Sequence, residues 1–274
     1  MIKKMVGIIG CGNMGQAILA AGLKNKDLRF LVCEKKEEIV KKLKDKFGRY
    51  EENVKFKDIS EVVQESDVVI VAVKPQDIEG VLQQMHQFLE WRFKKLLVVS
   101  IVAGIKIEYL EEMLGEKIKV IRAMPNIAIT VEEGITAFKR GRLVSLEDLK
   151  IVQEIFSSVG KTLEIKNEEL MDVITAISGS GPAYVAYIVN AILKSADSLG
   201  LERDSSRLLV YQTFLGTLKF LKENNFDTED IISKVASKGG TTEQALKVFK
   251  NCKLEQIIQK AVVSAYKRAK EISC

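Results

Sequence analysis

The chain has 274 residues, of which 47% are hydrophobic and 29% charged, with a formal net charge of +5 and a single histidine, His86. One histidine excludes metal sites built on two His ligands, and the mild, dispersed positive charge is not the basic stripe of a nucleic-acid binder. No apolar run reaches the roughly 18 residues of a membrane span. We therefore expect a cytoplasmic protein without a metal, nucleic-acid or membrane partner.

The cysteines show neither the C-x-x-C spacing of a zinc site nor the pattern of a disulfide framework. They are Cys11, Cys33, Cys252 and Cys274. Reduced thiols in a cytosolic protein are the simplest interpretation.

The first half of the chain alternates short apolar runs with amphipathic segments. The runs lie at residues 6–9, 30–33, 68–73, 96–102 and 119–124, and two further candidate strands lie at 135–138 and 162–165. Apolar runs without polar alternation are typical of a parallel sheet covered on both faces. Because amphipathic segments such as 77–89 separate them, we expect an α/β domain with a doubly wound, mostly parallel sheet.

Beyond Asn167 almost every segment has the three- and four-residue apolar spacing of a helix. The predicted helices are 182–199, 205–223, 228–236, 242–249 and 254–272. This change predicts a domain boundary between residues 166 and 167, with an all-α domain at 167–274. Segment 182–199 is apolar on most sides, so either a partner subunit covers it or it forms the centre of its own domain.

The sequence Gly10-Cys11-Gly12-Asn13-Met14-Gly15 follows the first strand and opens a helix. In this context G-x-G-x-x-G predicts a Rossmann dinucleotide-binding loop. Gly10 makes the tight turn, Gly12 lets the backbone approach a pyrophosphate, and Gly15 lets helix and strand pack closely. The helix N-terminus offers free N–H groups to the phosphates.

Residues at the end of the second strand bear on the choice of dinucleotide. Glu34 can bond a ribose 2′-OH, which favours NADH. Lys35 and Lys36 can pair with a 2′-phosphate, which favours NADPH. The two signals conflict and leave the preference open.

Three further motifs follow predicted strands. They are Val73-Lys74-Pro75-Gln76, Ser100-Ile101-Val102-Ala103-Gly104 and Met124-Pro125-Asn126. Ligands of an open parallel sheet bind outside the carboxyl ends of its strands, so these motifs predict the rest of a dinucleotide cleft.

Two clusters of small residues occur in the helical half. Ser178-Gly179-Ser180-Gly181-Pro182-Ala183-Tyr184 is predicted as a polar turn in which Pro182 opens the apolar helix. In Ser237-Lys238-Gly239-Gly240-Thr241-Thr242, successive N–H groups before a helix are suited to a carboxylate. Either threonine can serve as the N-cap.

Together these motifs resemble the pyrroline-5-carboxylate reductase family over essentially the whole chain. The resemblance implies a Rossmann domain, a helical domain that interlocks with its two-fold mate, and a dimer or a ring of dimers. It implies that N–H groups around Gly239, Gly240 and Thr241 hold the substrate carboxylate and that Thr242 bonds the ring nitrogen. Ser178, Gly179 and Ser237 are the further substrate-binding residues that we expect. The family usually has proline where this chain has Lys238, and it usually has proline ahead of the helix that here follows Phe226-Asp227.

Imine reduction suits a site without a histidine base, because a protonated cyclic imine needs orientation more than a strong acid. His86 lies in segment 77–89, away from the strand ends, and is not expected to act in catalysis. The alternatives are a reductase for another imine, a 3-hydroxyacid dehydrogenase using Asn190 and Lys194, and a dinucleotide-binding protein without activity.

Overall fold

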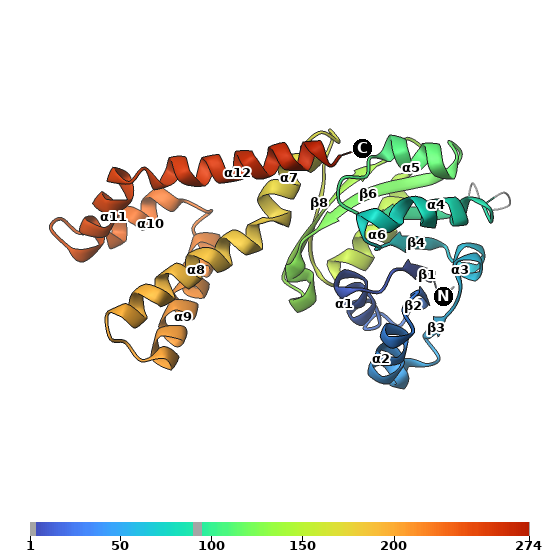
Figure 1. Cartoon of the computed structure of the whole chain (residues 1–274), viewed down its shortest axis with the longest axis horizontal. Helices are drawn as coiled ribbons and strands as arrows, with labels where there is room; N and C mark the ends of the chain where they lie inside the picture. Colours follow the sequence, from blue (N-terminus) through green and yellow to red (C-terminus); the bar gives the residue numbers. More distant parts are fainter. Residues whose placement is uncertain (1–3, 90–94, 274) are drawn as a thin grey trace. The chain divides into compact units, whose positions relative to one another are not determined.

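The computed structural model describes residues 4–89 and 95–273. The chain forms two compact units, one of Met1–Ser180 with Tyr266–Cys274 and one of Gly181–Ala265 (Figure 1). The first unit therefore extends past residue 166 and takes in the start of the helical half. The domain boundary between residues 166 and 167 stays a prediction. It marks where the strand pattern of the sequence ends, whereas the two compact units are defined by contacts within the folded chain.

One sheet organises the first unit, with the strand order β3-β2-β1-β4-β5-β6-β7-β8. The strands are β1 (Lys4–Ile9), β2 (Leu28–Cys33), β3 (Val54–Phe56), β4 (Val68–Val71), β5 (Leu97–Ser100), β6 (Lys119–Pro125), β7 (Gly134–Arg140) and β8 (Gly160–Glu164). Each pairing is parallel except that of β6 with β7. The mostly parallel, doubly wound sheet is confirmed. The sequence pattern missed β3, whose three residues are too few to show a period.

Helices cover both faces of this sheet. They are α1 (Asn13–Gly22), α2 (Glu37–Phe47), α3 (Ile59–Glu65), α4 (Ile78–His86), α5 (Ile107–Leu114), α6 (Leu146–Ser157) and α7 (Leu170–Ile174). Short helical turns lie at η1 (Gly48–Tyr50), η2 (Pro75–Asp77) and η3 (Ile127–Val131), and a π-helix lies at η4 (Thr175–Gly179).

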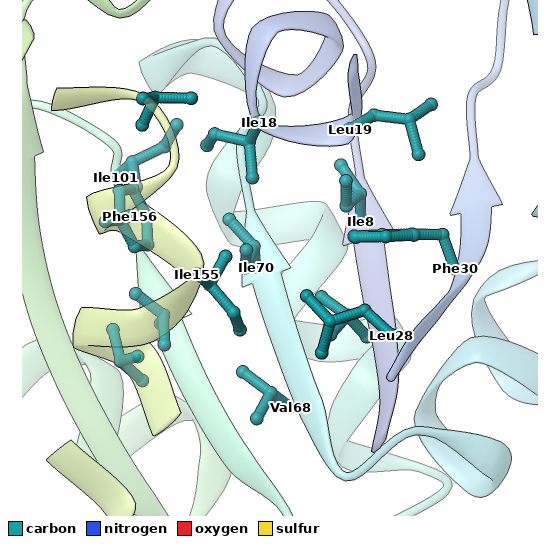
Figure 2. Packing of buried hydrophobic residues seen from close by; sticks show 14 of the residues in the cluster. Ile8, Ile18, Leu19, Leu28, Phe30, Val68, Ile70, Ile101, Ile155 and Phe156 are labelled. Atoms are coloured by element: carbon teal, nitrogen blue, oxygen red, sulfur yellow. The ribbon is translucent and has the colours of Figure 1, made fainter. Parts of the chain in front are cut away.

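The continuous apolar runs follow from this double cover. Val68 and Ile70 of β4 belong to a core with residues of α1 and α6, whereas Val69 belongs to a second core with residues of α3, α4 and α5. Figure 2 shows part of the first core, with Ile18 of α1 and Ile155 of α6 beside the β4 side chains. Because successive strand residues point to opposite faces, both sets must be apolar.

The second unit is helical, as predicted. Its helices are α8 (Gly181–Ser198), α9 (Arg203–Glu223), α10 (Thr228–Val235) and α11 (Thr241–Asn251), followed by α12 (Leu254–Glu271), which belongs to the first unit from Tyr266 onward. Pro182 is the second residue of α8.

Apolar side chains of α8 are exposed in the single chain. None of its residues is buried, and Tyr187 is 77% exposed. Helix α9 likewise exposes Leu208 and Tyr211. Helix α8 is therefore not the buried centre of its own unit, which removes one of the two explanations drawn from its sequence.

One helix in the described part of the chain is long and apolar enough to cross a membrane by length and composition. It spans Leu170–Ser198, and its most apolar 18-residue window has a mean hydropathy of 1.3, with 6% of that window buried. The prediction that no stretch reaches this length is wrong by this measure. A mean over a window tolerates the small polar residues, such as Ser178 and Asn190, that interrupt the apolar run.

Candidate functional site

The loop after β1 has the backbone that its glycines predict. Gly10 has a φ of +88°, and a Cβ there would lie 2.9 Å from the carbonyl oxygen of Ala72. A Cβ at Gly15 would lie 2.5 Å from the Gly10 carbonyl oxygen, so α1 approaches the strand more closely than a side chain allows. The Cβ position of Gly12 has no atom within 4 Å, which leaves open space at the loop. These are the three roles that a pyrophosphate-binding loop requires.

The N-terminus of α1 is free to bind an anion. Gly12 is its N-cap and supplies no side-chain hydrogen bond, while Asn13 and Met14 begin the first turn. The first N–H groups of a helix lack partners within it and lie at the positive end of its dipole. The residues present therefore fit a dinucleotide phosphate.

A cleft of about 660 Å³ lies beside this loop. Its lining includes residues predicted from the sequence to bind the dinucleotide, namely Gly10, Gly12, Glu34, Lys35, Lys36, Val73 and Lys74. The cleft lies where β1 and β4 are neighbours and the strand order reverses. Dinucleotides bind at such a switch point in doubly wound sheets.

Glu34 joins the end of β2 to the glycine loop. Its Oε2 accepts a hydrogen bond from the Cys11 N–H at 2.9 Å, and its Oε1 accepts one from the Lys36 N–H at 3.1 Å. The carboxylate is thus held at the wall of the cleft, where the predicted ribose contact would place it.

Asp77 also lines the cleft, although no sequence signal marked it. Its Oδ1 lies 2.6 Å from the Lys35 ammonium, so this lysine is paired across the cleft. This ion pair joins the end of β2 to η2, and these two segments are distant from each other in the sequence. Gly80 and Gln84 of α4 complete this wall and were likewise missed, because a helix face carries no motif.

The two cysteines near the loop are protonated thiols. Burial, followed by the charge of Glu34, raises the pKa of Cys11 to about 12. Burial, followed by the charges of Asp58 and Glu34, raises the pKa of Cys33 to about 11. Neither is a thiolate nucleophile at neutral pH. Cys11, Cys33 and Cys252 are free, and Cys274 lies outside the described residues.

The remaining predicted dinucleotide residues lie at the carboxyl ends of strands but outside this cleft. Pro75 begins η2, and Ala103 and Gly104 follow β5, where a Cβ at Gly104 would lie 2.4 Å from the Ile272 carbonyl oxygen. Met124 and Pro125 are the last residues of β6, and Asn126 precedes η3. The strand extends through Pro125 because β7 pairs with it up to that point.

The predicted turn at Ser178 and Gly179 is a π-helix instead. The Ser180 N–H donates to the Thr175 carbonyl oxygen at 2.9 Å, five residues earlier. A Cβ at Gly179 would lie 2.7 Å from the Met124 methyl group, so glycine lets this segment approach the end of β6. Polar composition suggested a turn, but small residues also accommodate the wider π-turn, which often occurs at functional sites.

Asn126 joins the same two segments. Its side-chain amide donates to Ser178 Oγ at 3.4 Å. Within the first unit, the structure thus brings together two motifs that are far apart in the sequence.

The glycine turn of the second unit leads directly into α11. Gly239 has a φ of +75°, and Gly240 is the N-cap, so neither threonine has the predicted capping role. Thr241 and Thr242 form the first turn instead, and a Cβ at position 240 would lie 2.5 Å from Ser237 Oγ, so a larger residue there would require the serine side chain to move. Thr241 is exposed and Thr242 is half-buried. The Gly239 N–H donates to the Glu243 carboxylate at 2.7 Å.

A buried ion cluster lies near the amino end of α7 and was not predicted. Arg122 of β6 is 3% exposed, and its guanidinium lies 2.9 Å from Glu168 Oε1 and 3.6 Å from Asp172 Oδ1. The same Glu168 oxygen accepts the Ile107 N–H at 2.9 Å. This cluster joins β6, α5 and α7, whose continuation carries Ser178. In the sequence, a single arginine within an otherwise apolar strand was the signal that could have indicated this cluster.

His86 is the last residue of α4, is exposed, and does not line the cleft. The described residues contain no group of three or more His, Cys, Asp and Glu side chains that could hold a metal ion.

Comparison with protein families gives two matches. A model of pyrroline-5-carboxylate reductase dimerisation matches residues 168–272. A model of NADP oxidoreductase, coenzyme F420-dependent, matches residues 5–104, which contain the glycine loop and the cleft.

Relatives and solved structures cover nearly the entire chain. The pyrroline-5-carboxylate reductase of Methanosarcina acetivorans is 34% identical over 99% of both chains, and that of Aquifex aeolicus is 32% identical over 99% of this chain and 98% of its own. The structure of a pyrroline-5-carboxylate reductase from Coxiella burnetii has a TM-score of 0.88 at 32% identity, covering 98% of each chain. The Plasmodium falciparum pyrroline carboxylate reductase with NADP bound has a TM-score of 0.87 at 27% identity, covering all of both chains.

Proposed function

The chain belongs to the pyrroline-5-carboxylate reductase family, and we propose that it reduces 1-pyrroline-5-carboxylate to L-proline, the last step of proline biosynthesis. The observation that carries this proposal is similarity over the full length, which includes both the dinucleotide loop and the helical half. The 3-hydroxyacid dehydrogenase alternative receives no such support.

The coenzyme is NAD(P)H, which supplies the hydride. The loop at Gly10, Gly12 and Gly15 and the first turn of α1 would hold the pyrophosphate, and Glu34 with the adjacent lysines would meet the adenosine ribose. The hydride would add to the carbon of the protonated C=N bond, the π electron pair of that bond would move to nitrogen, and nitrogen would keep the proton of the iminium to become the amine of proline.

The residues of the helical half would orient the substrate. Backbone N–H groups around Gly239, Gly240 and Thr241 would bind its carboxylate, and the Thr242 hydroxyl would bond the ring nitrogen. The carboxylate of Glu243 already accepts one of these N–H groups, which supports the anion-binding role of the turn. Ser237 of the second unit, and Ser178 and Gly179 of the first, are further residues that we propose to bind the substrate.

We further propose that the functional unit is a homodimer formed through the second unit. The apolar residues that α8 and α9 expose need a partner, and the matched model concerns dimerisation. A second copy would also account for the membrane-span-like helix Leu170–Ser198 without a bilayer. The enzyme would then act in the cytoplasm, as a dimer or a ring of dimers.

Turnover tests this proposal. Purified protein supplied with 1-pyrroline-5-carboxylate should consume NADPH or NADH and produce an equal amount of proline. If the protein oxidises the reduced coenzyme when supplied with the keto product of a 3-hydroxy acid, but not with 1-pyrroline-5-carboxylate, the result would support the dehydrogenase alternative instead.

A further inference from the structure

Asn126 is held between two partners on different elements. Its Oδ1 accepts the Ile135 N–H at 3.4 Å, and its Nδ2 donates to Ser178 Oγ at 3.4 Å. A backbone N–H can only donate, so the oxygen of the amide must face Ile135 and its nitrogen must face Ser178. The direction of the second hydrogen bond is therefore determined by the first.

This direction determines what the Ser178 hydroxyl can do. A hydroxyl that accepts from Asn126 must direct its own hydrogen toward another acceptor. Among the described residues, the Ser178 hydroxyl donates a hydrogen bond to none, and the side chain is half-buried. It lies in the π-helix η4, beside Gly179, which approaches Met124 at the carboxyl end of β6. The hydroxyl is thus a donor at the edge of the sheet where ligands bind.

We propose that Asn126 is a positioning residue, which holds the Ser178 hydroxyl as a hydrogen-bond donor to the carboxylate of the imino-acid substrate. The inference rests on the proposed reductase function. It gives Asn126 a role distinct from the dinucleotide contact that its sequence motif predicts.

Two substitutions of the same residue separate this role from a structural one. Asn126→Asp keeps the shape and the acceptor for the Ile135 N–H, but an ionised carboxylate only accepts, so it would draw the Ser178 hydrogen toward itself. Asn126→Ala removes both bonds. We expect Asn126→Asp to raise the KM for the imino acid at least as much as Asn126→Ala does, by about ten- to hundredfold, the range for a hydrogen bond to a charged group. If Asn126 only supports the backbone at Ile135, Asn126→Asp should resemble wild type, which would overturn the proposal.

The pH profile and direct binding add independent readouts. The activity of Asn126→Asp relative to wild type should rise as pH falls toward the ordinary carboxyl pKa of about 4, because a protonated carboxyl can donate again. The affinity for NADPH, measured by calorimetry, should stay unchanged. An equal loss of NADPH affinity would make Asn126 a coenzyme contact and contradict the proposal.

Ser178→Ala completes a double-mutant cycle. It should raise the KM for the imino acid by itself, and adding Asn126→Asp to it should cost much less than in wild type. Additive effects would mean that Asn126 does not act through Ser178. The failure of wild-type protein to reduce 1-pyrroline-5-carboxylate would refute the proposed function, whereas normal wild-type turnover with additive variants would refute only this inference.

Discussion

The Cys11 N–H donates a hydrogen bond of 2.9 Å to the carboxylate of Glu34, which ties the glycine loop to the end of β2. This contact places a negative charge at the wall of the dinucleotide cleft, beside two lysines of which Lys35 is paired with Asp77. We therefore expect the coenzyme preference to depend on the balance of these charges, which substitutions can change one residue at a time.

Glu34→Gln should shift the preference toward NADPH. Removal of a charge a few ångströms from the proposed 2′-phosphate position should raise the ratio of NADPH to NADH affinity by about five- to tenfold. Calorimetric binding of both coenzymes measures this ratio. Glu38→Gln, an exposed glutamate of α2 that does not line the cleft, is the matched control and should leave the ratio unchanged. A ratio that is constant or lower in Glu34→Gln would show that this carboxylate does not face the phosphate.

Alanine substitutions of two loop glycines should distinguish a role in dinucleotide binding from a role in folding. Gly12→Ala places a methyl group in open space, so the unfolding temperature should stay near that of wild type while dinucleotide affinity falls. Gly15→Ala places one 2.5 Å from the Gly10 carbonyl oxygen, so α1 must move, at a cost of about 1–3 kcal/mol. Thermal unfolding and calorimetry of both variants give the comparison. Equal destabilisation by both substitutions would contradict the assignment of Gly12 to the ligand.

The threonines at the start of α11 provide a matched pair. Thr242→Ala should lower kcat by about ten- to hundredfold, because the proposed hydrogen bond to the ring nitrogen is lost, with little effect on NADPH affinity. Thr241→Ala keeps the backbone N–H that the proposal uses and should change kcat little. Comparable losses in both variants, or a loss of NADPH affinity in Thr242→Ala, would assign these residues to the fold rather than to the substrate.

Thiol reactivity should follow burial. At pH 8, iodoacetamide should modify the exposed Cys252 well before Cys11 and Cys33, whose raised pKa values of about 12 and 11 keep them protonated. Peptide mass spectrometry resolves the individual rates, and modification of Cys11 as fast as Cys252 would contradict its burial.

The raised pKa of Cys11 also predicts how the stability of the fold depends on pH. The ordinary pKa of a cysteine thiol is 9, so above pH 9 the Cys11 thiol ionises in the unfolded chain but not in the folded one. The folded state therefore loses stability relative to the unfolded chain as pH rises toward 12. Wild type should therefore lose stability relative to Cys11→Ala over this range, as measured by denaturant unfolding.

The sequence predicted those parts of the fold that follow from local pattern. Strands such as β4 were recognised because both of their faces are buried, and the glycine loop because each of its glycines has a steric reason. The short strand β3 and the antiparallel pairing of β6 with β7 depend on contacts between distant residues, which a pattern does not contain.

The candidate site shows the same limit. Its loop and strand-end residues could be found from motifs, but the pairing of Lys35 with Asp77 and the contact of Asn126 with Ser178 required the folded chain. The capping role of a threonine was mispredicted because composition does not show at which residue of the turn the helix begins, which is Thr241 after the N-cap Gly240. The apolar character of α8 was recognised, whereas its exposure in a single chain could be learned only from the structure.

Isotope transfer tests the central claim most directly. The protein should be incubated with 1-pyrroline-5-carboxylate and NADPH or NADH carrying deuterium at the transferable position of the nicotinamide ring. We predict proline with one deuterium, bound to the ring carbon of the former C=N bond, in an amount equal to the coenzyme oxidised. Oxidation of the coenzyme without labelled proline, or no reaction with either coenzyme, would contradict the account.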